Sequence, residues 1–431
     1  MPSETVKMVG HIIDSGQLAA VLDAILEHGA DYEIVDLAVG KQHADQSRVT
    51  IVVRADDEDV LVGALTSISN FGATSTEATD AVTEVADRDG AFPTDFYSTT
   101  NLPTQVRVDG HWIDVALPEM DCGIRIDADG TAHTIPVLDV KTGDRIVVGY
   151  EGVRVRPERS LPAPGQPRQF SFMSSEVSSE KPQRLLVQRV AEEMRACIER
   201  GERICWVAGP ALVHTGSVPA AVALVRAGYL QILFAGNALP THDIESNLYG
   251  TSLGISQAQG VPTEHGHSHH IRAVNEVRRA GSITAAVEQG VITGGLMHAC
   301  VTYGVEYVLA GSVRDDGPLP DVITDMVQAQ SAMRALVPQI GFCLVVCTML
   351  HGIATGNLLP AYVPLVCVDI NPATVTKLAD RGSAQALGIV TDVGLFLKEL
   401  AEELAPAELA EELARSDTAG EMVPAADAPM S

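Results

Sequence analysis

The sequence has few basic side chains. Against 56 Asp and Glu it has only 29 Lys and Arg, which gives 431 residues a formal net charge of −27 and a pI near 4.7. Surfaces that bind nucleic acid or anionic membranes are rich in Lys and Arg, because those side chains neutralise phosphate. We therefore expect neither partner.

Long apolar runs are also missing, and none approaches the roughly 20 residues that span a bilayer. The start, MPSETVKMVGHIIDS, lacks the basic segment and the apolar core of a signal peptide. The seven cysteines form no CxxC pair, and several stand in apolar stretches, as buried free thiols do in a reducing compartment. These absences predict a cytoplasmic protein without a membrane partner.

The common glycine-rich nucleotide motifs, GxGxxG and GxxxxGK[ST], do not occur. A different stretch, Leu344–Pro372 (LVVCTMLHGIATGNLLPAYVPLVCVDINP), has the composition of two buried parallel strands, each followed by a helix. The second strand ends in Asp369, and Asn371-Pro372 is a strong helix-start signal. A carboxylate at the end of a parallel strand can bind both hydroxyls of an adenosine ribose. Alternatively, Asp369 only caps the following helix or loop.

Similar small-residue turns follow other apolar segments. The first strand of the stretch runs into Thr348–Gly352, whose hydroxyl and backbone N–H groups suit phosphate or ribose. Four further strand-to-turn segments repeat the pattern: RICWVAGPALVHTG (203–216), YLQILFAGNALPTHDIE (229–245), VEYVLAGSVRDDGPLPDV (305–322) and GIVTDVGLFL (388–397). The carboxyl ends of parallel strands share one sheet edge, so the repetition predicts a nucleotide site there.

The chain divides into four segments of an α/β protein. Strand–helix alternation predicts a ferredoxin-like βαββαβ module over 1–100, and short strands broken by turn signals predict a β-rich substrate-side subdomain and crossover over 101–182. Residues 183–398 have the βαβ pattern of a Rossmann-like parallel sheet. Residues 399–431, rich in Ala, Glu and Pro, predict a helix followed by a disordered tail.

Three groups of polar residues leave alternatives open. Glu119 and Asp121 stand between strands, as a solvated turn or as a carboxylate pair for a cationic amine. The run His265–His270 has four imidazoles, yet its spacing matches no common zinc site, so we expect a polar loop and no metal. His214, His242 and His351 each follow a strand end and are structural or catalytic.

Seven strings carry a resemblance to a known family: FMSSEVSSEKP (172–182), VAGPALVHTG (207–216), LFAGNALPTHDIE (233–245), AGSVRDDGPLPDV (310–322), TMLHGIATGN (348–357), VDINPATVTKLADRG (368–382) and VTDVG (390–394). The chain resembles the archaeal-type ornithine cyclodeaminases, which share the lysine-oxoglutarate reductase/saccharopine dehydrogenase conserved region. The same region forms the C-terminal half of cyanobacterial arginine dihydrolase/ornithine cyclodeaminases. The resemblance covers about 9–397.

The resemblance implies conversion of L-ornithine to L-proline and ammonia with tightly bound NAD⁺ that is recycled in each turnover. It also implies a nucleotide domain similar to that of deoxyhypusine synthase, consistent with the missing GxGxxG. The arginine dihydrolase half is absent from this chain, so arginine is not the expected substrate. A homo-oligomer, a dimer or a tetramer, is expected.

The resemblance also implies site residues. The family's cofactor positions fall on Asn237, Ala238, Asp316, Thr348, Met349, Leu350, His351, Asp369, Asp392 and Val393. The reaction needs a base for the α-ammonium, an anion for the δ-ammonium and a cation for the carboxylate. The candidates are Glu119 and Asp121 for the amines, Arg314 or Lys181 for the carboxylate, and His214 or Asp315 for proton transfer.

Two other functions remain open at this point. One is an NAD-dependent amino-acid dehydrogenase of the lysine/saccharopine type, which would release NADH. The other is a non-catalytic NAD-binding regulatory protein, in line with the ferredoxin-like module, which would bind NAD but release no ammonia.

Overall fold

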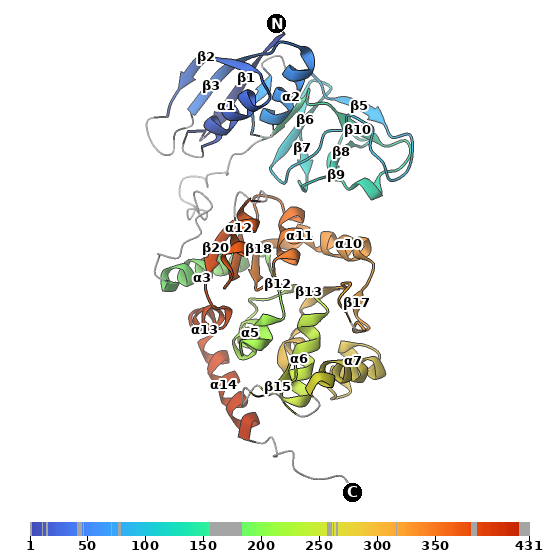
Figure 1. Ribbon diagram of the computed structural model, residues 1–431, viewed down its shortest axis with the longest axis vertical. Helices are drawn as coiled ribbons and strands as arrows, with labels where there is room; N and C mark the ends of the chain where they lie inside the picture. Colours follow the sequence, from blue (N-terminus) through green and yellow to red (C-terminus); the bar gives the residue numbers. More distant parts are fainter. Residues whose placement is uncertain are drawn as a thin grey trace. The chain divides into compact units, whose positions relative to one another are not determined.

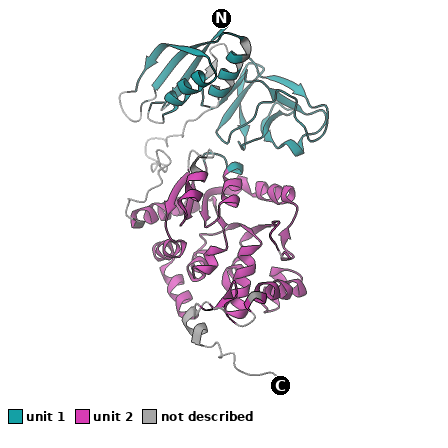
Figure 2. Ribbon diagram, in the orientation of Figure 1, with its two compact units in different colours: residues 1–174, 357–362 teal, residues 175–356, 363–431 magenta. Residues whose placement is uncertain are grey.

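The computed structural model describes residues 2–10, 12–13, 16–40, 45, 47–69, 71–75, 79–155, 183–256, 261, 263, 266–315, 317–380 and 386–421 (Figure 1). The chain forms two compact units, residues 1–174 with 357–362, and residues 175–356 with 363–431 (Figure 2). The predicted crossover and the final ten residues, 422–431, lie outside the described residues.

The first part of unit 1 is a four-stranded antiparallel sheet with two helices. The elements are β1 (Ser3–Gly10), α1 (Gln17–Glu27), β2 (Asp31–Ala38), β3 (Ser47–Arg54), α2 (Glu58–Ser69) and β4 (Thr74–Ser75). The strand order β2-β3-β1-β4 is the order of the predicted ferredoxin-like βαββαβ module. Alternate residues of β3, Val49, Ile51 and Val53, are fully buried and pack in one core with Val21 and Ile25 of α1.

The second part of unit 1 is a seven-stranded sheet of short strands. They are β5 (Val82–Val85), β6 (Thr104–Val108), β7 (His111–Ala116), β8 (Gly123–Ile126), β9 (Ala132–Ile135), β10 (Arg145–Val148) and β11 (Val153–Val155), with a 3-10 turn η1 (Val137–Asp139). The order is β11-β6-β7-β9-β8-β10-β5. The expected boundary at residue 100 is therefore misplaced for β5, which pairs antiparallel with β10.

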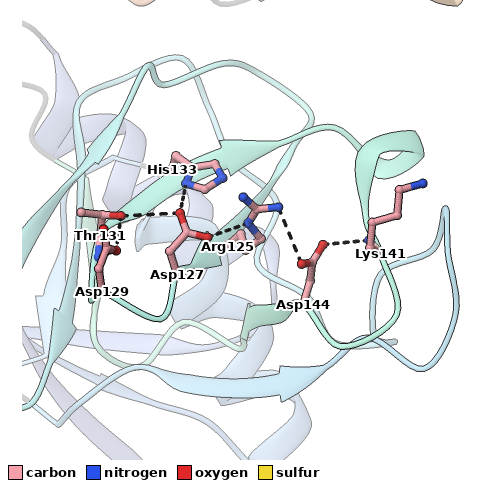
Figure 3. A network of polar contacts seen from close by, with 7 residues as sticks. All are labelled: Arg125, Asp127, Asp129, Thr131, His133, Lys141 and Asp144. Atoms are coloured by element: carbon pink, nitrogen blue, oxygen red, sulfur yellow. Dashed lines mark hydrogen bonds and ion pairs between the residues drawn. The ribbon is translucent and has the colours of Figure 1, made fainter.

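A polar network fixes one end of this sheet (Figure 3). The guanidinium of Arg125 on β8 lies 3.0 Å from Asp127 and 3.6 Å from Asp144. The carboxylate of Asp127 also lies 3.0 Å from Nδ1 of His133, across the β8–β9 hairpin. Because these side chains are partly exposed, we assign the network to holding the hairpin and the β10 entry together rather than to a large stability gain.

Unit 2 is built on a seven-stranded parallel sheet. Its strands are β12 (Arg203–Ala208), β13 (Ile232–Gly236), β16 (Glu306–Ala310), β17 (Val322–Ile323), β18 (Ile340–Val346), β19 (Leu365–Asp369) and β20 (Ala386–Val390). The strand order is β17-β16-β13-β12-β18-β19-β20. All seven residues of β18 are buried, as expected for a central strand covered on both faces. The predicted Rossmann-like sheet is confirmed.

Helices and short elements complete unit 2. They are α3 (Gln183–Glu199), α4 (Ala211–His214), α5 (Val218–Arg226), α6 (Ala238–Tyr249), β14 (Thr251–Ser252), β15 (Ile255–Ser256), η2 (Gly266–Ser268), α7 (His269–Ala280), α8 (Ile283–Glu288), α9 (Gly295–Thr302), α10 (Met326–Leu336), η3 (Val337–Gln339), α11 (Leu350–Leu358), α12 (Pro372–Asp380), α13 (Val393–Leu404) and α14 (Pro406–Glu421). Within the described ranges, no helix is both long and apolar enough to cross a membrane.

The last helix, α14, is part of the folded unit. Arg226 at the end of α5 contacts Glu411 at 2.6 Å and Glu412 at 2.7 Å, and Leu409 is buried. The prediction of a helix after residue 399 is right, but the sequence reading did not anticipate that this helix docks on α5.

Candidate active site

The strand order reverses direction between β12 and β18, and there the backbones after the two strands meet. The N–H of Gly209 donates to the carbonyl of Val346 at 3.0 Å, and a Cβ on Gly209 would lie 2.0 Å from the carbonyl oxygen of Cys347. Cys347 itself has a left-handed backbone with φ of 46°. In open parallel sheets ligands bind at this switch point. Only glycine fits at position 209 without displacing the neighbouring strand end.

The turn Thr348–His351 leads from β18 into α11. The first turn of any α-helix leaves N–H groups without partners inside the helix, so it can bind a phosphate or hydroxyl oxygen. His351 lies over the neighbouring strand ends, because a Cβ on Gly236 would be 3.4 Å from its ring. Burial lowers the pKa of His351 below its usual value, so the ring is neutral near pH 7. Met349 and Leu350 are exposed.

Asn237 and Ala238 join β13 to α6. The side chain of Asn237 is buried, and its Oδ1 accepts a hydrogen bond from the backbone N–H of Leu319 at 2.9 Å. This bond ties the segment after β16 to the strand end. Oδ1 of Asn237 thus already has a partner within the protein, and the cofactor role of both Asn237 and Ala238 stays a prediction.

Asp369 is the last residue of β19 and is 9 % exposed. Its Oδ1 accepts a hydrogen bond from the backbone N–H of Asn371 at 2.8 Å, and Asn371 in turn accepts from Ala373 in the first turn of α12. Within the part of the chain that the structure describes, Oδ2 of Asp369 accepts no hydrogen bond. The capping interpretation therefore holds for one oxygen, and the ribose contact of the other stays a prediction.

Asp392 and Val393 follow β20. The Asp392 side chain accepts from the N–H of Leu395 at 2.9 Å and so caps α13, while Val393 is buried. A Cβ on Gly394 would lie 3.2 Å from the carbonyl of Thr215, which places the loop after α4 against the start of α13. Here helix capping accounts for the carboxylate, and its cofactor role is untested.

The segment after β16 contains the remaining candidates of this sheet edge. Asp315 accepts a hydrogen bond from the N–H of Ser312 at 2.8 Å, and the N–H of Arg314 donates to the Ser312 hydroxyl at 3.0 Å. The Arg314 side chain is exposed. Asp316 and Lys181 lie outside the described residues, so their roles stay predictions.

His214 belongs to a histidine pair. Its Nδ1 lies 2.6 Å from the hydroxyl of Ser252, and its ring centroid is 4.9 Å from that of His242 in an edge-on arrangement. Burial, together with His242, lowers the pKa of His214, although Glu245 opposes the effect. His214 is therefore a neutral ring near pH 7 that can accept a proton.

Glu245 anchors this pair and was missed in the sequence. It is fully buried, and its carboxylate accepts from Thr251 at 2.9 Å and Gly254 at 3.0 Å and contacts Nδ1 of His242 at 2.8 Å. Burial alone would raise the pKa of Glu245, but these contacts outweigh it and lower the pKa. The spacing of His242 and Glu245, three apart on a helix, was the available signal.

The His265–His270 run does not form a metal site in the described residues. His269 contacts the hydroxyl of Thr251 at 2.8 Å and stacks on Tyr249 with ring centroids 4.9 Å apart. Among the residues that the structure describes, no group of three or more His, Cys, Asp or Glu side chains is placed to hold a metal ion. His265 lies outside them.

Glu119 and Asp121 lie in unit 1, in the loop between β7 and β8. Thr99 holds this loop: its hydroxyl donates to the Glu119 carbonyl at 2.5 Å, and its carbonyl accepts from the Asp121 N–H at 3.0 Å. Glu119 is buried, whereas Asp121 is exposed and has a left-handed backbone with φ of 61°. Hydrogen bonds to Thr99 therefore order this loop, and the interpretation of a solvated turn is wrong for Glu119.

The same loop is bonded to the end of α11. The N–H of Met120 donates to the carbonyl of Asn357 at 3.0 Å, and residues 357–362 belong to unit 1. Helix α11 thus begins after the Thr348–Met349 turn of one unit and ends within the other.

Comparison with known families matches three consecutive models to this chain. They are the LOR/SDH bifunctional enzyme conserved region over residues 3–102, the first region of the C-terminal part of the ArgZ-like arginine dihydrolases over 103–187, and the Rossmann fold of that C-terminal part over 188–400.

Individual relatives cover nearly the whole chain. An ornithine cyclodeaminase of Methanothermobacter thermautotrophicus is 49 % identical over 94 % of this chain and 98 % of its own length. The apo structure of the cyanobacterial arginine dihydrolase ArgZ has a TM-score of 0.81 and 37 % identity. The match covers 94 % of this chain but only 58 % of ArgZ. A ternary complex of AgrE with ornithine and NAD⁺ has a TM-score of 0.50 and 38 % identity, with 94 % and 57 % of the two chains covered.

Proposed function

Because the chain belongs to the ornithine cyclodeaminase family that shares the ArgZ-like C-terminal regions, we propose that it converts L-ornithine to L-proline and ammonia with bound NAD⁺. The observation that carries the proposal is similarity over almost the full length of an archaeal ornithine cyclodeaminase. The AgrE complex with ornithine and NAD⁺ supports the same substrate and cofactor.

The sheet edge of unit 2 fits NAD⁺ without a GxGxxG motif. Gly209 allows the close backbone approach at the switch point, the first turn of α11 offers N–H groups to phosphate, and Asp369 offers Oδ2 to ribose hydroxyls. A carboxylate repels a 2′-phosphate, so we expect NAD⁺ rather than NADP⁺. When bound, NAD⁺ supplies a hydride acceptor that returns the hydride within the same turnover.

The chain's own residues have to hold the charges of ornithine and move its protons. The δ-ammonium and the α-ammonium need anions, for which Glu119 and Asp121 remain our candidates. The substrate carboxylate needs a cation, Arg314 or Lys181. Loss of a proton from the α-ammonium needs a neutral base, and His214, whose pKa is lowered by burial, suits that role better than an ionised imidazolium. Asp315 is the alternative.

His214 can use only one nitrogen for this work. Its Nδ1 is committed to Ser252, so Nε2 is the atom available to substrate or water. The Glu245–His242 contact holds the His242 ring behind that of His214. We propose that Glu245 and His242 position His214 and support its proton transfer.

The experiment that tests the function uses the purified protein without added cofactor. Incubation with L-ornithine should give proline and ammonia in equal amounts, with no accumulation of NADH; L-lysine and L-arginine serve as comparison substrates. NADH produced in proportion to substrate would instead indicate the dehydrogenase. Bound NAD without ammonia from any basic amino acid would indicate the regulatory protein.

We also propose that the chain is a homo-oligomer of the cytoplasm. All seven cysteines are free thiols, and six are buried, which suits a reducing compartment. An apolar edge strand in unit 1 supports self-association.

A further inference from the structure

The strand β2 is an edge strand of the four-stranded sheet (Figure 1). It lies at the end of the order β2-β3-β1-β4, and within the described residues it pairs with β3 alone. Along and just after it, Ile34, Val35, Leu37 and Val39 are 39 %, 61 %, 45 % and 57 % exposed. Long apolar edges recruit another strand unless they are blocked, so this edge calls for a covering partner.

We propose that the β2 edge pairs antiparallel with β2 of a second copy of this chain, joining two four-stranded sheets into one. Two of these exposed apolar side chains point to the helix-covered face: Ile34 lies opposite buried Ile51, and Leu37 opposite buried Val49. The intervening bulge, where the register shifts between Ile34 and Asp36, is what brings both to the same face.

This bulge makes the strand self-complementary. With a two-fold axis between Val35 and Asp36, Ile34 of one copy lies opposite Leu37 of the other, on the same face of the joined sheet. Paired residues of antiparallel strands share a face, and apolar cross-strand pairs stabilise a sheet. Glu33 then lies opposite Ala38, so no two acids oppose each other.

The charges of the edge also favour a second copy over a basic partner. Of the three acids of β2, two are already paired with β3: Glu33 lies 2.5 Å from Arg54, and Asp36 lies 3.5 Å from Arg48. The third, Asp31, accepts a hydrogen bond from the N–H of Tyr32 at 2.8 Å. A basic protein would therefore gain little at this edge, while two copies approach without strong repulsion between their acids.

One test compares the assembly mass of two matched variants of the full chain. Leu37→Lys places a charge in the joined strands, whereas Leu138→Lys adds the same charge to η1, beside the second sheet of unit 1, at a side chain that is 55 % exposed. By sedimentation or light scattering, Leu37→Lys should have half the parent's mass with an unchanged melting temperature, and Leu138→Lys the parent's mass. A monomeric parent, or an unchanged mass in Leu37→Lys, would overturn the proposal.

A second test checks the register. The double variant Ile34→Cys/Leu37→Cys should form an intermolecular disulfide on mild oxidation, because the thiol at position 34 of one copy lies opposite the thiol at position 37 of the other. Because Ile34 and Leu37 lie opposite residues two apart on β3, their Cα atoms are roughly 7 Å apart within one copy, at the limit for a disulfide, so the cross-link is scored as a covalent dimer on a non-reducing gel. The single variants are the controls. Cross-linking of the singles as readily as the double, or none in the double, would contradict this register.

Discussion

Replacing Asp369 with Asn tests the ribose contact without removing the local turn. An Asn side chain can keep the hydrogen bond that Oδ1 accepts from the Asn371 N–H at 2.8 Å, so the start of α12 should be preserved. What is lost is the negative charge at Oδ2, at a residue that is 9 % exposed. The substitution therefore separates the cofactor role from the capping role, which Asp369→Ala would remove together.

The expected magnitude follows from the kind of bond. A hydrogen bond to a charged, buried acceptor is worth about 1.5–3 kcal/mol, which corresponds to roughly a ten- to hundredfold weaker binding. The dissociation constant of NAD⁺ should rise by that factor. The constant of NADP⁺ should stay level or fall, because the carboxylate that repels its 2′-phosphate is gone.

The assay is a titration of cofactor-free protein by calorimetry or by NADH fluorescence, with the melting temperature of the free protein as the control for folding. If Asp369→Asn binds NAD⁺ as tightly as the parent, and prefers it over NADP⁺ to the same extent, the ribose role of Asp369 is wrong and capping is its whole function.

Three further predictions concern the substrate, the mechanism and the switch point. Glu119→Gln or Asp121→Asn should lower turnover about ten- to hundredfold while NAD stays bound; normal kinetics in both would remove this loop from the active site. Ornithine deuterated at the α-carbon should give proline that still has deuterium at that carbon, because the hydride is returned within the site, and mass spectrometry showing full loss of the label would defeat the recycling scheme. Gly209→Ala, whose Cβ would lie 2.0 Å from the Cys347 carbonyl, should abolish NAD binding or folding. Gly356→Ala is the matched control, because its Cβ would be 3.7 Å from the nearest atom of Leu365, and equal NAD binding by both variants would contradict the close-approach argument.

The sequence determined much of unit 2 by local pattern. Each buried strand is a short apolar run, and each is followed by a turn of small or polar residues, so strand ends such as Asp369 and the Thr348–His351 turn could be located in advance. The same locality explains an error: β5 looked like part of the first module because it follows it in the chain, but its pairing with β10 is a non-local choice.

Other features depend on which distant segments become neighbours, and only the tertiary structure decided them. Strand order brings Gly209 against Cys347, more than a hundred residues away, and converts a plain glycine into a required one. Packing of α6 against β14 buries Glu245 and brings the rings of His214 and His242 into contact. Local pattern fixes which face a side chain takes, whereas contacts between distant segments depend on packing that no short window of sequence contains.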